Sequence, residues 1–310
     1  MIGKTNKFVF ILILLFAFNG CRVAGSNRQA QPGQLKVVVT TGILADAVRH
    51  IGGENLYIVT LMGPGVDPHL YKASEGDVME LDKADIIVYQ GLHLEGKMAD
   101  ILHKIGRVKK VIAAGELVSE ERLLSPPEFK GQHDPHIWFD LSIWAELVDS
   151  LSVRFAKLDT VHTEEYLANG ARYSAELRAL HSAIRDSIAI IPPNQRVLIT
   201  AHDAFSYFGI AYGVEVRALQ GLSTMSEYGL MDVTDLVDFI VKRKIKAIFV
   251  ETSLPVRSIR AVQAGVRGKG HQVEIGGELY SDALGAVDTP EGTFIGMVKH
   301  NTTTIVKALK

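Results

Sequence analysis

The tripeptide Asp-Pro-His occurs twice in this chain, as Asp67-Pro68-His69 and as Asp134-Pro135-His136. Each proline fixes its own φ and restricts the preceding aspartate to extended conformations, so each histidine leaves a stiffened backbone in a narrow range of directions. A third histidine, His202, follows directly on a predicted strand. Imidazoles held in fixed directions suit a metal site. If these three converge, the chain binds a divalent transition metal.

The elements that must position these histidines are βα units. From Leu35 onward, short apolar runs alternate with longer amphipathic segments, which is typical of parallel sheets covered by helices. Strands are expected at residues 36–40, 57–62, 85–89, 110–114, 197–200, 214–216, 247–251 and 272–275. Helices are expected to begin near Ile43, Ser74 and Gly96, and a last helix is expected at residues 291–309.

One long helix is predicted between the two groups of strands. From about Thr163 to Ile191, apolar residues recur at intervals of three, four and seven positions. At 1.5 Å per residue this segment would span roughly 44 Å, about the length of a whole domain. Pro192-Pro193 ends it, because proline lacks the amide hydrogen that a helix needs. The expected fold class is therefore α/β, with two βα lobes joined by one long backbone helix.

Several candidate ligands share one edge of the predicted sheets. In open parallel sheets, ligands bind at the carboxyl ends of the strands. His69 lies in the loop after the second strand, His202 follows the fifth, and Asp282 follows the eighth, whereas His136 lies in the crossover before the long helix. Three imidazoles and one carboxylate suit zinc, manganese, cobalt or nickel, and suit calcium or magnesium poorly.

Other side chains near this edge are candidates for a supporting role. Glu251 ends its strand and could orient a ligand imidazole through a hydrogen bond, although a buried structural pair explains it equally well. His93 also lies at the carboxyl end of a strand, where a capping or supporting role is expected. Asp67 and Asp134 could orient the neighbouring histidines or cap turns.

Composition and charge exclude some classes of protein. With 47% hydrophobic and 22% charged residues among 310, the chain is expected to fold as a globular protein. Its net charge of -2, without a dense cluster of lysine or arginine, disfavours nucleic-acid binding.

The N-terminus is typical of a secretory signal. Lys4 and Lys7 precede an apolar run, residues 8–18, that is too short for a bilayer, which takes about 20 residues. Cys21 is the only cysteine, so no intramolecular disulfide can form. Its place after a small residue resembles the lipobox of bacterial lipoproteins, in which the cysteine is lipidated, although Phe18-Asn19 departs from that pattern. A chance cysteine after an ordinary signal is the alternative.

The expected organisation places the folded protein outside the cytoplasmic membrane, periplasmic or on its outer face. In order along the chain we expect a signal peptide (1–20), a tether (21–34), an N-terminal lobe (35–160), a linker helix (161–192) and a C-terminal lobe (193–310).

Five segments of the chain resemble a single family. They are GPGVDPHLY (63–71), DPHIWFD (134–140), TAHDAFSYF (200–208), IFVETS (248–253) and GGELYSDALG (276–285). Together they resemble the cluster A-I metal-binding solute receptors of bacterial ABC importers, most closely the TroA type, which binds zinc and manganese. The resemblance runs from about Leu35 to the end of the chain.

This resemblance implies a C-clamp of two lobes, each with a four-stranded parallel sheet, and one metal ion between them. The family's ligands match His69, His136, His202 and Asp282, of which the last is often bidentate. Related manganese receptors commonly have glutamate at the position of His202. Dedicated zinc receptors often have a histidine-rich loop, but residues 116–132 contain no histidine. The resemblance thus favours a dual-metal receptor.

The expected function is a solute-binding protein, not an enzyme, that captures Zn²⁺ or Mn²⁺ and delivers it to the permease of an ABC transporter, acting as a monomer. One alternative is a zinc metallohydrolase that uses the same histidines. Hydrolytic zinc sites keep a position for water, however, and the chain has neither a His-Glu-x-x-His nor a Gly-x-Ser-x-Gly motif. A surface adhesin that contains metal is the other alternative.

Overall fold

Residues 30–129 and 131–310 are described by a computed structural model of the chain. The predicted signal peptide and Cys21 lie outside the described residues. Within residues 30–310, apart from position 130, no helix combines the length and the apolar character needed to cross a membrane.

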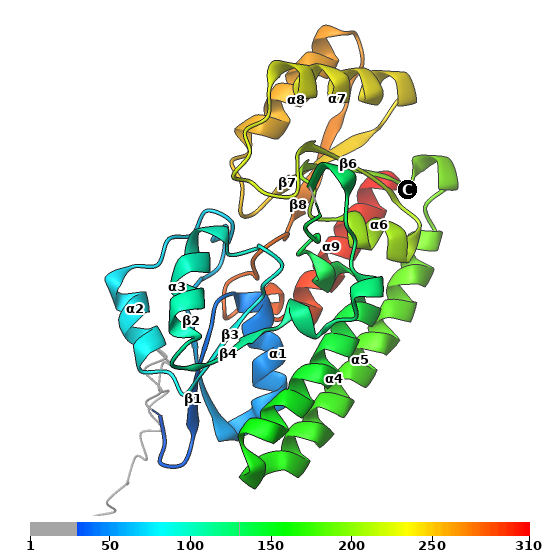
Figure 1. Cartoon of the computed structure of the whole chain (residues 1–310). Helices are drawn as coiled ribbons and strands as arrows, with labels where there is room; N and C mark the ends of the chain where they lie inside the picture. Colours follow the sequence, from blue (N-terminus) through cyan, green and yellow to red (C-terminus); the bar gives the residue numbers. More distant parts are fainter. Residues whose placement is uncertain (1–29, 130) are drawn as a thin grey trace, which may run out of the picture.

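The N-terminal lobe is built on a four-stranded parallel sheet with the order β2-β1-β3-β4. Its strands are β1 (Leu35–Val39), β2 (Leu56–Thr60), β3 (Ile86–Tyr89) and β4 (Lys110–Ala113). Helices α1 (Gly42–Gly52), α2 (Glu75–Asp82) and α3 (Ala99–Ile105) connect and cover them (Figure 1). Val37, Val38 and Val39 in the central strand β1 are fully buried, as expected for a parallel sheet covered on both faces. All four carboxyl ends therefore lie at one edge.

The C-terminal lobe differs from the expected single four-stranded sheet. Its strands are β5 (Val197–His202), β6 (Glu215–Gln220), β7 (Ala247–Glu251) and β8 (Glu274–Leu279). They form two parallel pairs, β5-β6 and β7-β8, with β5 lying beside β7. At the carboxyl end of β5, the backbone N–H groups of Ala201 and His202 donate to the Glu251 side chain, at 2.7 and 3.0 Å. The Glu251 side chain thus joins the carboxyl ends of β5 and β7.

Four helices pack around these strand pairs: α6 (Ser206–Tyr212), α7 (Leu230–Arg243), α8 (Arg257–Gly268) and α9 (Phe294–Leu309). Two of them, α7 and α8, lie at the end of the lobe that is far from the N-terminal lobe (Figure 1).

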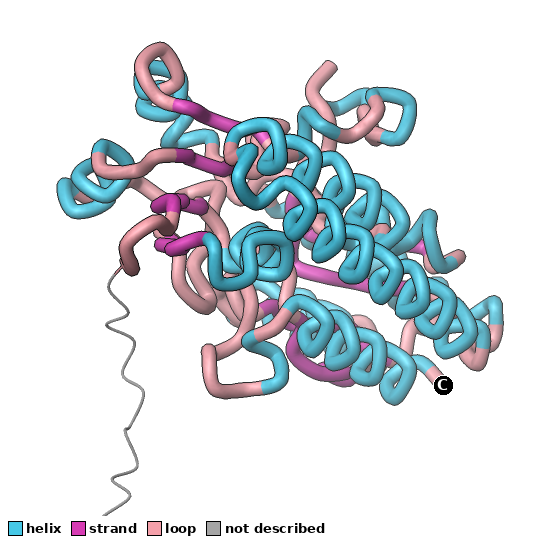
Figure 2. Tube along the Cα trace, turned by 90° about the horizontal axis from the view of Figure 1, so that it is seen from below, coloured by secondary structure: helices cyan, strands magenta, loops and turns pink. Residues whose placement is uncertain are grey.

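The long linker helix is accompanied by a second helix. The predicted linker helix is confirmed as α5 (Thr163–Ala189), but α4 (Leu141–Leu158) packs beside it along its length. Figure 2 shows these neighbouring helices. The side chain of Asp140 begins α4 by accepting from Ser142 N, at 2.9 Å. Helices α4 and α5 thus form a hairpin, and its second helix, α5, leads into the C-terminal lobe.

The largest apolar core is continuous from one lobe to the other. It joins Val37 of β1, Trp144 of α4, Leu177 of α5 and Phe294 of α9. The rings of Trp144 and Phe294 have centroids 5.6 Å apart. Because this core is shared, the lobes are joined firmly along α4, α5 and α9. Smaller separate cores fill the α7–α8 end of one lobe and the α2–α3 side of the other.

Candidate metal centre

The structure brings together all four residues that the sequence singled out as ligands. His69, His136, His202 and Asp282 are buried, and one potential ligand atom from each lies within 4.8 Å of the others. The Nε2 atoms of His69 and His136 are 3.3 Å apart. The Asp282 carboxylate lies 3.2 Å from His202 Nε2 and 3.6 Å from His136 Nε2.

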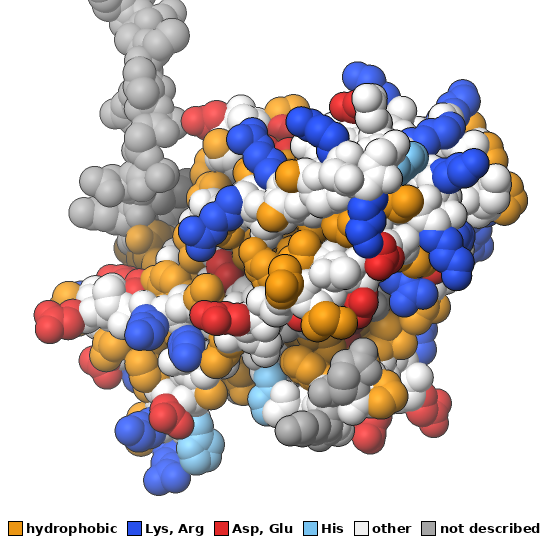
Figure 3. Space-filling view, turned by 90° about the horizontal axis from the view of Figure 1, so that it is seen from above, with side chains coloured by type: hydrophobic (Ala, Val, Ile, Leu, Met, Phe, Trp, Pro, Cys, Tyr) orange, Lys and Arg blue, Asp and Glu red, His pale blue; other side chains and the backbone are white. Residues whose placement is uncertain are grey.

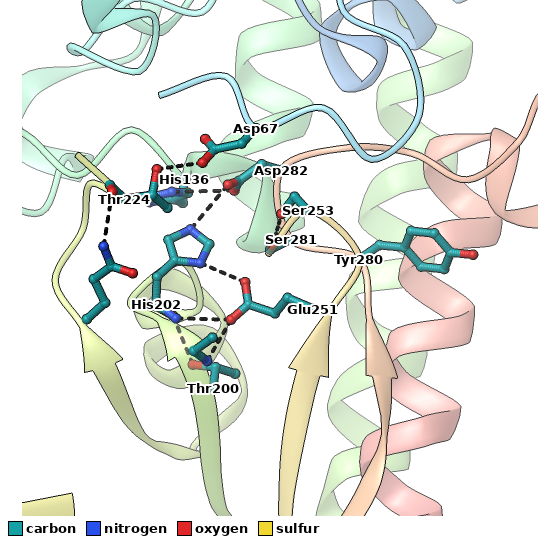
Figure 4. Close-up of polar contacts among 12 residues, drawn as sticks. Asp67, His136, Thr200, His202, Thr224, Glu251, Ser253, Tyr280, Ser281 and Asp282 are labelled. Atoms are coloured by element: carbon teal, nitrogen blue, oxygen red, sulfur yellow. Dashed lines mark hydrogen bonds and ion pairs between the residues drawn. The ribbon is translucent and has the colours of Figure 1, made fainter. Parts of the chain in front are cut away.

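Each of the four comes from the loop or strand end expected to carry it. His69 follows β2, His136 precedes α4, His202 is the last residue of β5, and Asp282 lies just beyond β8. Figure 4 shows His136, His202 and Asp282 pointing toward one another from these different elements. Strands β5 and β8 extend further than predicted, but both still end at the site.

The donor atoms at this point fit a metal ion. Both Asp282 carboxylate oxygens and His202 Nε2 are buried, and their polar contacts are only with other atoms of this cluster of described residues. Buried polar atoms are normally satisfied by a partner. These three atoms face a common point, and a metal ion bound there would satisfy all of them. Three imidazole nitrogens and a carboxylate are the donor set of zinc and of similar divalent transition metals.

Carboxylates orient two of the three imidazoles. Asp134 Oδ1 lies 2.7 Å from His136 Nδ1 and also accepts from His136 N at 2.9 Å. Glu251 Oε2 lies 2.6 Å from His202 Nδ1. When Nδ1–H donates to a carboxylate, Nε2 is left unprotonated and free to bind a metal. Of the two interpretations left open for Glu251, the orienting role matches this hydrogen bond.

His69 is held differently. Its Nδ1 is buried, with no hydrogen-bond partner among the residues described. Asp67 contacts the backbone of His69 and not the ring, since Oδ1 accepts from His69 N at 2.9 Å. The other oxygen of Asp67 accepts from Thr224 Oγ1 of the opposite lobe, at 2.6 Å. Asp67 therefore caps its turn and links the lobes.

Comparison with known proteins identifies the family. The family model described as zinc-uptake complex component A, periplasmic, matches residues 37–308. The chain belongs to this zinc-uptake family. It is 48% identical over 300 residues to the manganese-binding lipoprotein MntA of Bacillus subtilis (strain 168), covering 97% of each chain. It is 45% identical over 285 residues to the zinc-binding protein TroA of Treponema pallidum (strain Nichols), covering 92% of each.

Solved structures confirm the fold class of this zinc-uptake family member. The periplasmic zinc-binding protein TroA from Treponema pallidum superimposes with a TM-score of 0.87 and 45% identity, covering 89% of this chain and 99% of that one. The two-lobed α/β architecture with a long helix is therefore common to both.

Electrostatics of the site distinguish its histidines. Burial lowers the pKa of His69 to about 3, so its imidazole is neutral at physiological pH. Burial also lowers the pKa of His202, but the carboxylates of Glu251 and Asp282 outweigh it and raise that pKa well above 6.5. Burial alone would raise the pKa of Asp282, yet the adjacent imidazoles, His202 foremost, hold it well below its usual range. The metal-free site thus contains a buried ion pair.

The prediction of a supporting role for His93 is wrong. His93 is exposed, and its φ of 67° places it in a left-handed turn of the backbone. The buried acid of this segment is Glu95, which accepts from Thr40 Oγ1 and Gln90 N, each at 2.7 Å. Gln90 in turn donates to Pro135 O at 3.2 Å, so Glu95 supports the His136 segment through its neighbour.

Two aromatic residues that sequence reasoning missed connect the site across the lobes. Trp138 Nε1 donates to Ser281 O at 3.0 Å, next to Asp282. Tyr207 OH donates to Asp134 O at 3.1 Å. Both aromatics lie inside the segments that carry the family resemblance. The sequence could have indicated them, because a buried tryptophan or tyrosine usually needs a hydrogen-bond partner and both lie in segments that carry a ligand.

Proposed function

We propose that this chain is the extracytoplasmic solute-binding protein of an ABC importer for a divalent transition metal, Zn²⁺ or Mn²⁺. The buried cluster of His69, His136, His202 and Asp282 carries this proposal, because two ligands come from each half of the molecule. The metal ion is the transported cargo. Its two-sided coordination holds the lobes closed, so release requires the permease to disturb a ligand loop.

The proposal includes export and attachment to the membrane. Residues 1–20 direct export, Cys21 carries the lipid, residues 21–34 form the tether, and the boundaries of the lobes and linker are those expected from the sequence. The monomer delivers its metal to the transmembrane subunits of the permease. The relatives MntA, a manganese-binding lipoprotein, and TroA, a periplasmic zinc-binding protein, support this location.

Zinc is expected to bind more tightly than manganese in vitro. A set of nitrogen and oxygen ligands follows the Irving–Williams order, in which Mn²⁺ is the weakest first-row divalent metal. The metal that is carried in the cell depends on availability as well. No observation favours the hydrolase or the adhesin, and Asp282 supplies a fourth protein ligand where hydrolytic sites keep a water.

Metal uptake by cells tests the proposal. Cells that lack this gene should accumulate less radioactive zinc or manganese, and the wild-type chain should restore accumulation. His202→Ala should not restore it, whereas His300→Ala, the same change outside the cluster, should. Elemental analysis of the protein purified from its native host identifies the cargo. Full restoration by His202→Ala, or hydrolysis of generic esters that this variant abolishes, would refute the receptor as the sole function.

A further inference from the structure

The three ligand histidines are not equally fixed in place. His136 and His202 each have a carboxylate on Nδ1, at 2.7 and 2.6 Å, whereas the buried Nδ1 of His69 has no partner among the described residues. The orientation of His69 therefore depends on its backbone. That backbone belongs to a loop in which Gly63 and Gly65 are exposed, and Gly65 has a φ of 70°. Although prolines stiffen part of this loop, its two exposed glycines give it points at which it can bend.

One path of hydrogen bonds connects this loop to the opposite lobe. Gln220, at the end of β6, donates from Nε2 to Thr224 O at 3.0 Å. Thr224 Oγ1 donates to Asp67 Oδ2 at 2.6 Å, and Asp67 Oδ1 accepts from His69 N at 2.9 Å. Figure 4 shows Thr224 and Asp67 facing each other above the cluster. The path joins a strand of the C-terminal lobe to the backbone of an N-terminal ligand.

The other cross-lobe bonds at the site are more protected. Trp138 Nε1–Ser281 O and Tyr207 OH–Asp134 O are both buried, whereas the Asp67–Thr224 bond is part-buried and joins two side chains. A part-buried hydrogen bond between side chains can break without disturbing the core. Its loss frees the His69 loop and leaves the segments that carry His136, His202 and Asp282 in place.

We propose that Thr224 and Asp67 form a latch that holds His69 on the metal, and that this latch sets the rate of metal release. His69 is then the first ligand to leave. Thr224 and Asp67 are positioning residues, since they act on the metal only through His69. This inference rests on the proposed function of the site as a metal receptor.

Dissociation of Zn²⁺ from the full-length protein, followed by stopped flow after mixing with excess EDTA, tests the latch. Thr224→Val keeps the shape of the side chain but removes the hydroxyl, and it should speed dissociation about five- to tenfold, as expected for a lost hydrogen bond. Thr224→Ser keeps the hydroxyl and should dissociate at close to the wild-type rate. Thr234→Val is the control: its hydroxyl donates to Leu230 O of the same helix, so its loss should leave the rate of zinc dissociation unchanged.

A double substitution separates the latch from a general loosening of the loop. If Thr224 acts through Asp67, Thr224→Val should add little once Asp67→Ala is present. Unchanged dissociation from Thr224→Val, or Thr224→Ser dissociating as fast as Thr224→Val, would overturn the latch while leaving the receptor function standing. Failure of the wild-type protein to retain Zn²⁺ would overturn both.

Discussion

Three imidazoles and one carboxylate share a buried space in which protonation and metal binding compete. In the metal-free protein Glu251 and Asp282 favour a proton on His202, because they raise its pKa well above 6.5 despite burial. His69 carries no proton, since burial lowers its pKa to about 3. A metal ion that binds all three Nε2 atoms must displace the proton of His202. The residues around the ligands therefore determine how binding responds to pH.

Zinc binding should release about one proton per metal ion at pH 7. Because the pKa of His202 is raised, the affinity for zinc should already fall as the pH drops through neutrality, by about tenfold per pH unit. With an ordinary imidazole pKa, about 6.5, the fall would begin only near pH 6. Calorimetric titrations in buffers of different ionisation enthalpy measure the released protons. Glu251→Gln removes a carboxylate that raises the pKa of His202, so zinc binding to this variant should release fewer protons. The same release from both proteins would contradict this account.

At the scale of elements, the α4–α5 hairpin depends on a close approach of two helices. Gly170 of α5 faces Ser152 of α4 so closely that an added Cβ would lie 1.8 Å from Ser152 Oγ and 2.6 Å from its Cβ. Glycine in a helix interior costs about 1 kcal/mol relative to alanine. The tight packing of the hairpin explains why a glycine occupies this position despite that cost.

Gly170→Ala should lower the free energy of unfolding by about 1–3 kcal/mol, because the clash outweighs the better helix propensity of alanine. Chemical denaturation of the metal-free protein measures the change. Adding Ser152→Gly should recover part of the loss by removing the clashing side chain. Gly76→Ala in α2 is the control, since its nearest neighbour would lie 3.6 Å away. A Gly170→Ala protein as stable as the wild type would show that the hairpin is loosely packed.

At the scale of the whole molecule, the lobes are joined on two sides. Along α4, α5 and α9 a continuous apolar core connects them. At the site they are connected by the cluster of ligands and by hydrogen bonds such as Trp138–Ser281. Figure 3, viewed from above the α7–α8 end, shows apolar side chains surrounded by charged ones at the surface. A core shared between lobes restricts large hinge motion, so we expect local movement of ligand loops.

Metal should therefore stabilise the whole fold against unfolding. An ion that binds only the folded state at a free concentration of a thousand times Kd adds about 4 kcal/mol to stability. Differential scanning calorimetry should show one transition that moves to higher temperature with Zn²⁺ and returns with EDTA. Asp282→Ala should lose this shift, and His300→Gln should keep it. A shift of equal size in Asp282→Ala would mean that zinc stabilises the protein from elsewhere.

Local sequence patterns were enough to predict much of the fold and of the site. Short apolar runs predicted each of the eight strands in the described part of the chain, and helical periodicity predicted α5 to within two residues at its end. The two Asp-Pro-His motifs and the ends of strands indicated His69, His136, His202 and Asp282. Such features follow from local backbone geometry, which the sequence records directly.

Tertiary structure alone decided which side chains support the ligands and which helices lie side by side. Helix α4 escaped prediction although Trp144, Val148 and Leu151 recur at helical spacing, so the sequence carried the signal for the helix but not for its packing beside α5. At the turn after β3, the positive φ of His93 leaves that side chain exposed, and Glu95 is the buried one. Asp67 and Thr224 are 157 positions apart, and they meet only because the shared core fixes one lobe against the other. Local sequence thus determines where each ligand residue leaves the backbone, whereas packing between distant segments determines which side chains hold it in place.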